Sequence, residues 1–297
     1  MSRSSFNTPA PISVALDLYV ADVHFTASDR TDTHVEVRPS NPDKAADIKA
    51  AEGTRVEYDD ATRTLSIVSR KRLNRLVGVS SKRSESVDIV IELPTDSNVH
   101  GEAGVGDFVS EGVLGDVGLK TGLGAVRLAE TGPLTVRNGC GDIAVEGVTG
   151  AAEIHSSNGE VRIGTVDGTG EVSSSNGEVR IGLVTGAATV KTSYGPLSIS
   201  RALSDITAAS SNGEVRIGEV VRGKVSATSK NGGVEVGVRE GSAAWLELNT
   251  GVGRVYNELD DADAPEAGEP VDRVEVHAAT KLGDVTIRRA PQLNDRV

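Results

Sequence analysis

The sequence predicts an all-β protein built as a parallel β-solenoid of 18-residue coils, with an irregular N-terminal β cap region. A nine-residue spacing of glycines runs from Gly106 to Gly232, and Ser204 stands at the one position that lacks a glycine. The nonapeptide SSNGEVRIG occurs three times, at 156–164, 174–182 and 210–218. Aromatic residues make up only 3% of the chain, which suits a narrow interior between stacked strands. A short, fixed period of this kind indicates stacked supersecondary units.

Each nine-residue unit has room for one strand and one tight corner. Glycine permits the positive φ that a corner requires, and the apolar residues two and four positions later alternate with polar ones, as in a strand. In the unit that begins at Gly159, we expect Val161 and Ile163 to point inward and Glu160 and Arg162 to point outward. Because the nonapeptide recurs after 18 residues, two units form one coil, and each strand should lie next to its equivalent one coil earlier.

The chain divides into two predicted regions. Residues 1–11 are expected to be a loose tail. Residues 12–98 form the N-terminal β-strand cap region, because strand-like alternation occurs there without the nine-residue period; a short helical turn is expected within 41–53. Residues 99–289 form the β-solenoid repeat domain, with an acidic loop insertion at 257–270.

The two ends of the predicted solenoid need protection. A stack of coils leaves an unpaired strand edge at each end, and such edges recruit other chains. We expect the cap region to cover one edge. The strands around Val274 and Val285 are expected to close the other edge, beyond the coil around Val255.

Charge and composition narrow the function classes. The net charge of -12 argues against nucleic-acid binding, which depends on clustered Lys and Arg. The single cysteine, Cys140, excludes an internal disulfide framework and a CxxC metal or redox site. No secretory signal pattern and no run of about 18 apolar residues is present. We therefore expect a cytoplasmic protein without a membrane span, without cofactors, and monomeric or weakly homo-oligomeric.

One row of residues immediately precedes alternate glycines of the repeat. Apolar Leu123 and Leu282 occupy this row near its ends, which suggests that it points inward, and asparagines occupy its middle: Asn158, Asn176, Asn212 and Asn231. One interpretation is a structural ladder in which each side-chain amide bonds to the next coil. The other is that Asn-Gly merely favours a left-handed turn. At Tyr194 the same row has either an exposed anchor or a packed corner residue.

Two surface features are candidate interaction sites. The outward rows of Glu160, Glu178 and Glu214 and of Arg162, Arg180 and Arg216 are expected to neutralise each other as a solvated face, with a partner-binding face as the alternative. Residues 70–83 carry six positive charges and no acidic residue. This segment is either a solvated hairpin loop or a contact for an acidic partner or a membrane surface, and its candidate partner contacts are Arg70, Lys71, Arg72 and Arg75.

The sequence contains no recognisable catalytic or metal-binding pattern. Calcium-binding nonapeptide repeats share the nine-residue period, but the aspartates that follow glycine here precede the apolar position directly, which is the wrong face. Glycan-cleaving β-helices need paired carboxylates in a groove built by long loops, and these corners are short. The five histidines are scattered, and no Ser-His-Asp or P-loop pattern appears. We expect no catalytic, cofactor-binding or metal-ligating residues.

The segment VDIVIELPTDSNV (87–99), followed by glycine-rich units and NGEVRIG-like repeats, resembles the bacterial β-strand repeat family called "putative adhesins", a domain of unknown function common in actinobacteria. The resemblance extends from about Ile12 to Arg289. It implies a β-solenoid and, through the family name alone, adhesion; it supplies no catalytic residues. Together with the residue patterns, it leads us to expect a non-enzymatic scaffold for protein–protein interaction or adhesin-like binding. The alternative is a glycan-binding or glycan-acting β-helix protein.

Overall fold

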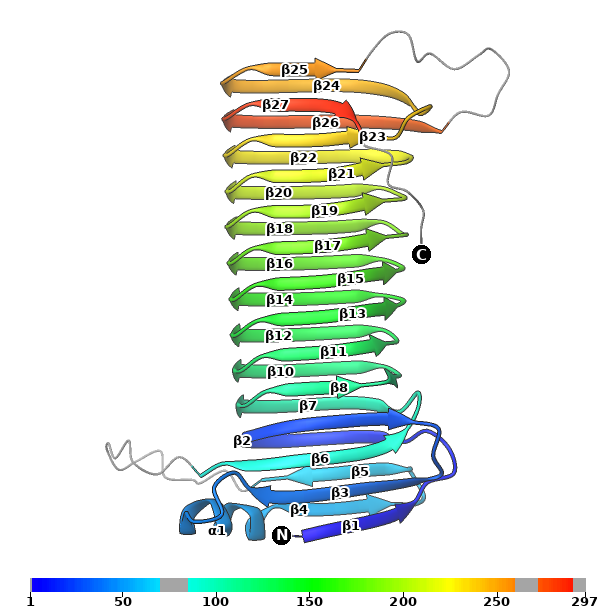
Figure 1. Cartoon of the computed structure of the whole chain (residues 1–297), viewed down its shortest axis with the longest axis vertical. Coiled ribbons are helices and arrows are strands. Elements are labelled where there is room, and N and C mark those ends of the chain that lie inside the picture. The colour runs from blue at the N-terminus through cyan, green and yellow to red at the C-terminus, as the bar shows by residue number, and fades with distance from the viewer. Residues whose placement is uncertain (1, 70–84, 260–271, 291–297) are drawn as a thin grey trace. The chain divides into compact units, whose positions relative to one another are not determined.

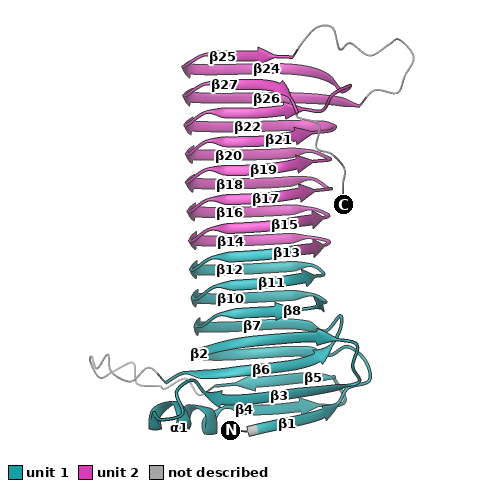
Figure 2. Cartoon of the chain, in the orientation of Figure 1, with its two compact units in different colours: residues 1–146 teal, residues 147–297 magenta. Residues whose placement is uncertain are grey.

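The computed structural model describes residues 2–69, 85–259 and 272–290. These residues form two compact units, 1–146 and 147–297 (Figure 2). Strands dominate both units, and the described residues contain a single helix. The predicted boundary between cap and solenoid near residue 98 differs from this division and stays a prediction.

The first unit begins with strands that have no nine-residue repeat (Figure 1). Its elements are β1 (Ser2–Asn7), β2 (Ser13–Ser28), β3 (Asp32–Pro39), α1 (Ala45–Gly53), β4 (Arg55–Asp59), β5 (Thr64–Val68), β6 (Val87–Pro94), β7 (Asn98–Val105), β8 (Phe108–Glu111), β9 (Val113–Leu114), β10 (Val117–Leu123), β11 (Val126–Thr131), β12 (Leu134–Cys140) and β13 (Ile143–Thr149), the last of which contains the unit boundary.

The long strand β2 forms the first coil of this unit. Its first half pairs in parallel with β5 and β7, and its second half pairs in parallel with β6 and β8. Beyond β5 and β6 the pairing becomes antiparallel, because β4 joins β5, β3 joins β6, and β1 joins β3. The sequence prediction of a loose tail was therefore wrong for β1, whose backbone groups complete the edge of β3. The expected helical turn is confirmed as α1.

The second unit consists of parallel strands alone. Its elements are β14 (Ala152–Asn158), β15 (Val161–Asp167), β16 (Gly170–Asn176), β17 (Val179–Val184), β18 (Ala188–Tyr194), β19 (Leu197–Ala202), β20 (Ile206–Asn212), β21 (Val215–Val220), β22 (Gly223–Asn231), β23 (Val234–Val238), β24 (Ala243–Val252), β25 (Val255–Glu258), β26 (Arg273–Leu282) and β27 (Val285–Arg289).

These strands form the predicted solenoid, with two strands in each coil. Val161 lies in register with Val179 on the next coil, and Asn158 with Asn176. Val161 and Val179 are fully buried between the two sheets, as the alternation predicts. Gly177 turns the corner at φ +134°, and a Cβ there would lie 2.0 Å from the carbonyl oxygen of Gly159. The stacked corners therefore admit only glycine at this position.

The end of the second unit differs from the prediction. The strands β26 and β27 do not close the stack, because β26 lies between β22 and β24, and β27 lies between β23 and β25 (Figure 1). The coil made of β24 and β25 is the terminal one among the described residues. Val255 is accordingly 43% exposed, whereas Val285, its neighbour in register, is fully buried. Alternation alone cannot reveal this order, since β24 and β26 have similar patterns.

Candidate functional site

The two outer faces of the second unit differ in chemistry. On the face formed by β15, β17, β19 and β21, glutamates and arginines pair with each other. The guanidinium of Arg180 lies 2.6 Å from both Glu160 and Glu178, and Arg162 lies 2.7 Å from Glu160. As the sequence predicts, these rows neutralise one another, so this face offers a partner few unpaired charges.

The opposite face carries hydroxyl groups and lysines. An open pocket of about 740 Å³ is lined by residues of seven strands: β14, β16, β18, β20, β22, β26 and β24. Its outward side chains are mainly small or hydroxyl-bearing, and none of the described residues that line it carries a carboxyl group. We call this surface the hydroxyl–lysine trough; its outward residues include Ser173, Ser175, Lys191, Ser193, Ser211, Thr228, Lys230 and Lys281.

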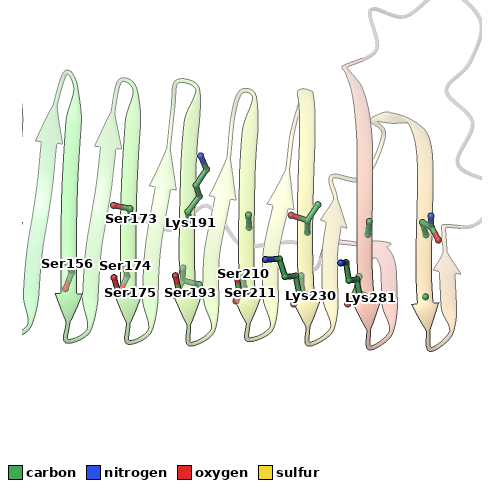
Figure 3. A pocket seen from close by; sticks show the side chains of 18 residues that line it. Ser156, Ser173, Ser174, Ser175, Lys191, Ser193, Ser210, Ser211, Lys230 and Lys281 are labelled. Atoms are coloured by element: carbon green, nitrogen blue, oxygen red, sulfur yellow. The ribbon is translucent and has the colours of Figure 1, made fainter.

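The trough concentrates positive charge on an acidic protein. Lys191, Lys230 and Lys281 are all exposed, and within the described part of the chain none of the three ammonium groups has an ion-pair or hydrogen-bond partner. Lys230 and Lys281 lie on the neighbouring strands β22 and β26, and Figure 3 shows the ammonium of Lys281 turned toward the strand that carries Lys230. An anionic group in the trough would relieve the repulsion between these charges.

A row of buried hydroxyls lies beneath the trough, on the inward side of the same strands. The Thr280 and Ser229 hydroxyls donate to the corner carbonyls of Gly232 and Gly213 over 2.8 and 2.9 Å. Three other hydroxyls of the row find no hydrogen-bond partner among the described residues: Ser156, Ser174 and Thr192. Strand alternation points these groups into the stack, so they lie beneath the trough and not among the outward residues that a partner would contact first.

The predicted asparagine row lies on the surface and not inside a corner. Leu123 and Leu282 in the same row are 52% and 50% exposed, and Tyr194 is 61% exposed. The inward interpretation was wrong because two successive residues face outward where each of these strands ends.

Hydrogen bonds nevertheless join asparagines of neighbouring coils. Asn176 Nδ2 donates to Asn158 Oδ1 over 3.1 Å, and Asn231 Nδ2 donates to Asn212 Oδ1 over 2.7 Å. Tyr194 separates the two pairs, since it is in register with both Asn176 and Asn212. The contribution of this ladder to stability stays a prediction.

The other predicted contact is the basic segment 70–83. Arg70, Lys71, Arg72 and Arg75 lie outside the described residues, as do residues 260–270 of the acidic insertion. No helix in the described part of the chain has the length and apolar content that a membrane crossing requires. Among the same residues, His, Cys, Asp and Glu form no group of three or more that could hold a metal ion.

The histidines are less isolated than their spacing in the sequence suggested. Each lies within 4 Å of a carboxylate oxygen: His24 near Glu111 (3.7 Å), His34 near Asp32 (2.9 Å), His100 near Asp116 (3.8 Å), His155 near Glu153 (3.0 Å) and His277 near Glu247 (2.7 Å). Glu111 and Glu247 come from a neighbouring strand and Asp116 from a corner, whereas Asp32 and Glu153 lie two residues from their histidine on the same strand. Stacking therefore creates some of these pairs and strand parity creates the others.

One histidine completes a Ser-His-Glu arrangement that sequence reasoning missed. His155 Nδ1 lies 2.5 Å from Ser173 Oγ, and His155 Nε2 lies 3.0 Å from Glu153 Oε1. Serine hydrolysis also needs donors fixed at the position of the oxyanion. Ser173 lies on β16, which pairs with β14 on one side and β18 on the other, so hydrogen bonds between strands occupy its backbone amides. Lys191 on β18 supplies charge on a flexible side chain, which is not a preorganised oxyanion hole.

Comparisons with known proteins give a family and a set of remote structures. A family model described as "Toastrack DUF4097" matches residues 13–288. No curated protein matches the chain. A structure from Bacteroides fragilis described as a "putative adhesin" is 13% identical, with 96% of each chain covered and a TM-score of 0.38. A "putative lipid binding protein" from Parabacteroides distasonis is also 13% identical, with 96% of each chain covered and a TM-score of 0.37.

Proposed function

We propose that this chain, which belongs to the Toastrack DUF4097 family, is a non-enzymatic, adhesin-like scaffold that binds an acidic protein segment in its hydroxyl–lysine trough. The observation that carries the proposal is the set of three unpartnered lysines in a pocket without a lining carboxylate, on a chain of net charge -12. Charge complementarity of this kind selects partners and steers their approach.

The shape of the trough fits an extended ligand. Its lining residues come from seven parallel strands whose neighbours lie about 4.8 Å apart, so it is elongated along the stack. Serine and threonine hydroxyls between the lysines both donate and accept hydrogen bonds. Carboxylates of an extended acidic segment could therefore contact lysines while its backbone contacts hydroxyls. A cytoplasmic location is part of this proposal, and cell fractionation tests it.

A labelled oligoglutamate peptide tests the binding proposal through fluorescence anisotropy. Reversing Lys191, Lys230 and Lys281 to Glu should weaken binding at least about tenfold, and raising the ionic strength should weaken binding to the native protein. The matched control reverses three exposed cations outside the trough, namely Lys49, Arg55 and Arg254, and changes the net charge equally. Equal losses in the two variants would mean that net charge alone attracts the peptide, and the trough would be excluded as the site.

The basic segment predicted from the sequence enters the same experiment. A third variant reverses Arg70, Lys71, Arg72 and Arg75 to Glu. Loss of binding in this variant, with binding retained when the trough lysines are reversed, would move the contact from the trough to residues 70–83. Loss in both variants would indicate that one acidic partner contacts both sites.

A further inference from the structure

Trp245 stands exposed on the outer face of the terminal coil. It is the only tryptophan in the sequence, and 57% of it is exposed. Its ring packs edge-on against His277, with centroids 5.3 Å apart and an interplanar angle of 62°. A large apolar ring left in water is unfavourable for an isolated protein, whereas a ring of this kind is typical of ligand-binding surfaces.

Two carboxylates hold His277, the residue that supports this ring, in place. His277 Nδ1 lies 2.7 Å from Glu247, and His277 Nε2 lies 2.5 Å from Glu275. Glu275 also accepts a hydrogen bond from Lys224 Nζ over 3.0 Å. The bonds from His277 and Lys224 hold the pKa of the Glu275 carboxyl below its usual range. The indole is therefore buttressed by an ordered network, which reduces the entropic cost of binding a ligand to it.

A pocket of about 640 Å³ adjoins the ring. Trp245, Arg273 and Glu275 line it, and its other lining residues are small or apolar: Gly223, Ala243, Ala244 and Val274. Trp245 and Glu275 are in register on neighbouring strands, and Arg273 lies two residues before Glu275 on the same face of β26. The guanidinium is thus a diagonal neighbour of the indole, at a separation that a long side chain spans.

The charges of the pocket decide between ligand classes. Glu275 is already engaged with Lys224 and His277, whereas Arg273 has no ion-pair or hydrogen-bond partner among the described residues. The group left free is therefore a cation whose planar fork fits a carboxylate. Arg273 and the nearby Lys224 disfavour a quaternary ammonium ligand, which would otherwise suit an exposed aromatic ring.

We propose that this pocket binds an acidic sugar unit, a hexuronate of a glycan chain. The C–H face of the pyranose ring lies on the indole, because the negative face of an aromatic ring attracts slightly positive C–H groups. The uronate carboxylate accepts two hydrogen bonds from Arg273. This site is separate from the hydroxyl–lysine trough in the residues that form it, and it would add glycan recognition to protein binding.

The fluorescence of Trp245 reports directly on the site. Titration with trigalacturonate should change the emission of the native protein with a Kd of about 1 mM or lower, and the neutral trisaccharide maltotriose should bind at least about tenfold more weakly. Arg273→Gln should remove this preference. Arg254→Gln, which alters an exposed arginine on the same coil, should leave it intact. Trp245→Ala, followed by calorimetry, should abolish binding of both sugars.

Three results would overturn the proposal. The first is an unchanged emission at saturating trigalacturonate, with calorimetry equally silent. The second is tighter binding of choline than of trigalacturonate, which would make the site a cation pocket. The third is an Arg273→Gln variant that retains the preference for the acidic sugar.

Discussion

Two buried threonines of one row allow a matched test of the hydrogen bonding inside the stack. Thr192 and Thr280 are 5% and 6% exposed. The Thr280 hydroxyl donates to the Gly232 carbonyl over 2.8 Å, whereas the Thr192 hydroxyl has no partner among the described residues. Replacing each with valine preserves the branched shape and exchanges the hydroxyl for a methyl group. The two variants therefore differ mainly in what that hydroxyl was bonded to.

The magnitudes follow from the two environments. Thr280→Val removes a hydrogen bond that contributes about 0.5–1.5 kcal/mol. Thr192→Val removes a buried, unsatisfied hydroxyl, whose desolvation costs about 1–3 kcal/mol. The gain from burying an additional methyl group is common to both. We expect Thr192→Val to be more stable than Thr280→Val by about 2 kcal/mol, and at least as stable as the native protein.

Urea unfolding measures this difference. With an m-value of about 3 kcal/mol/M, the expected difference separates the midpoints by roughly 0.7 M. Circular dichroism and the fluorescence of Trp245 should give coincident transitions, which shows that unfolding is cooperative. Equal destabilisation of the two variants would refute the reasoning, because the Thr192 hydroxyl would then have a bonding partner such as an enclosed water.

Three further predictions address the corners, the first unit and the serine. Gly177→Ala should lower the free energy of unfolding by at least about 2 kcal/mol, because alanine cannot adopt this φ without a clash. Asn176→Ala should lower it by less than about 1 kcal/mol, because water replaces the exposed hydrogen bond that the side chain makes. Similar urea midpoints for the two variants would contradict this prediction. Burial acts to raise the pKa of the Asp47 carboxyl, but hydrogen bonds, chiefly from Lys44 Nζ at 2.9 Å, hold that pKa below its ordinary value of 3.8. The carboxylate therefore stabilises the fold above this value and loses its contribution as the pH falls through the lowered pKa. Asp47→Asn should be less stable than the native protein at pH 7, and their urea midpoints should converge near pH 2; a constant gap would exclude this role. Ser173 should not react with a fluorophosphonate probe, since the described residues around it supply no fixed oxyanion donors. Mass-spectrometric detection of labelled Ser173, lost in His155→Gln, would overturn the non-enzymatic proposal.

The sequence by itself determined the architecture of the coil. The nine-residue glycine spacing and the apolar alternation at Val161 and Ile163 specify strand, corner and face, because side-chain direction in a strand depends on parity alone. The 18-residue recurrence predicted the observed register of Val161 with Val179. Local sequence patterns did not predict β1, which lies outside the periodic region. Its residues show little alternation, and the strand forms because it pairs with β3.

Only the tertiary structure decided which coils are neighbours and which side chains meet. Periodicity cannot distinguish β24 from β26, so the sequence did not predict that β26 pairs with β22. For the same reason it did not predict the contact between Trp245 and His277. The contact between Ser173 and His155 and the gathering of lysines in the trough likewise join residues from different strands. The physical reason is that parity assigns a residue to a face locally, whereas its partners on that face depend on the order in which the strands stack.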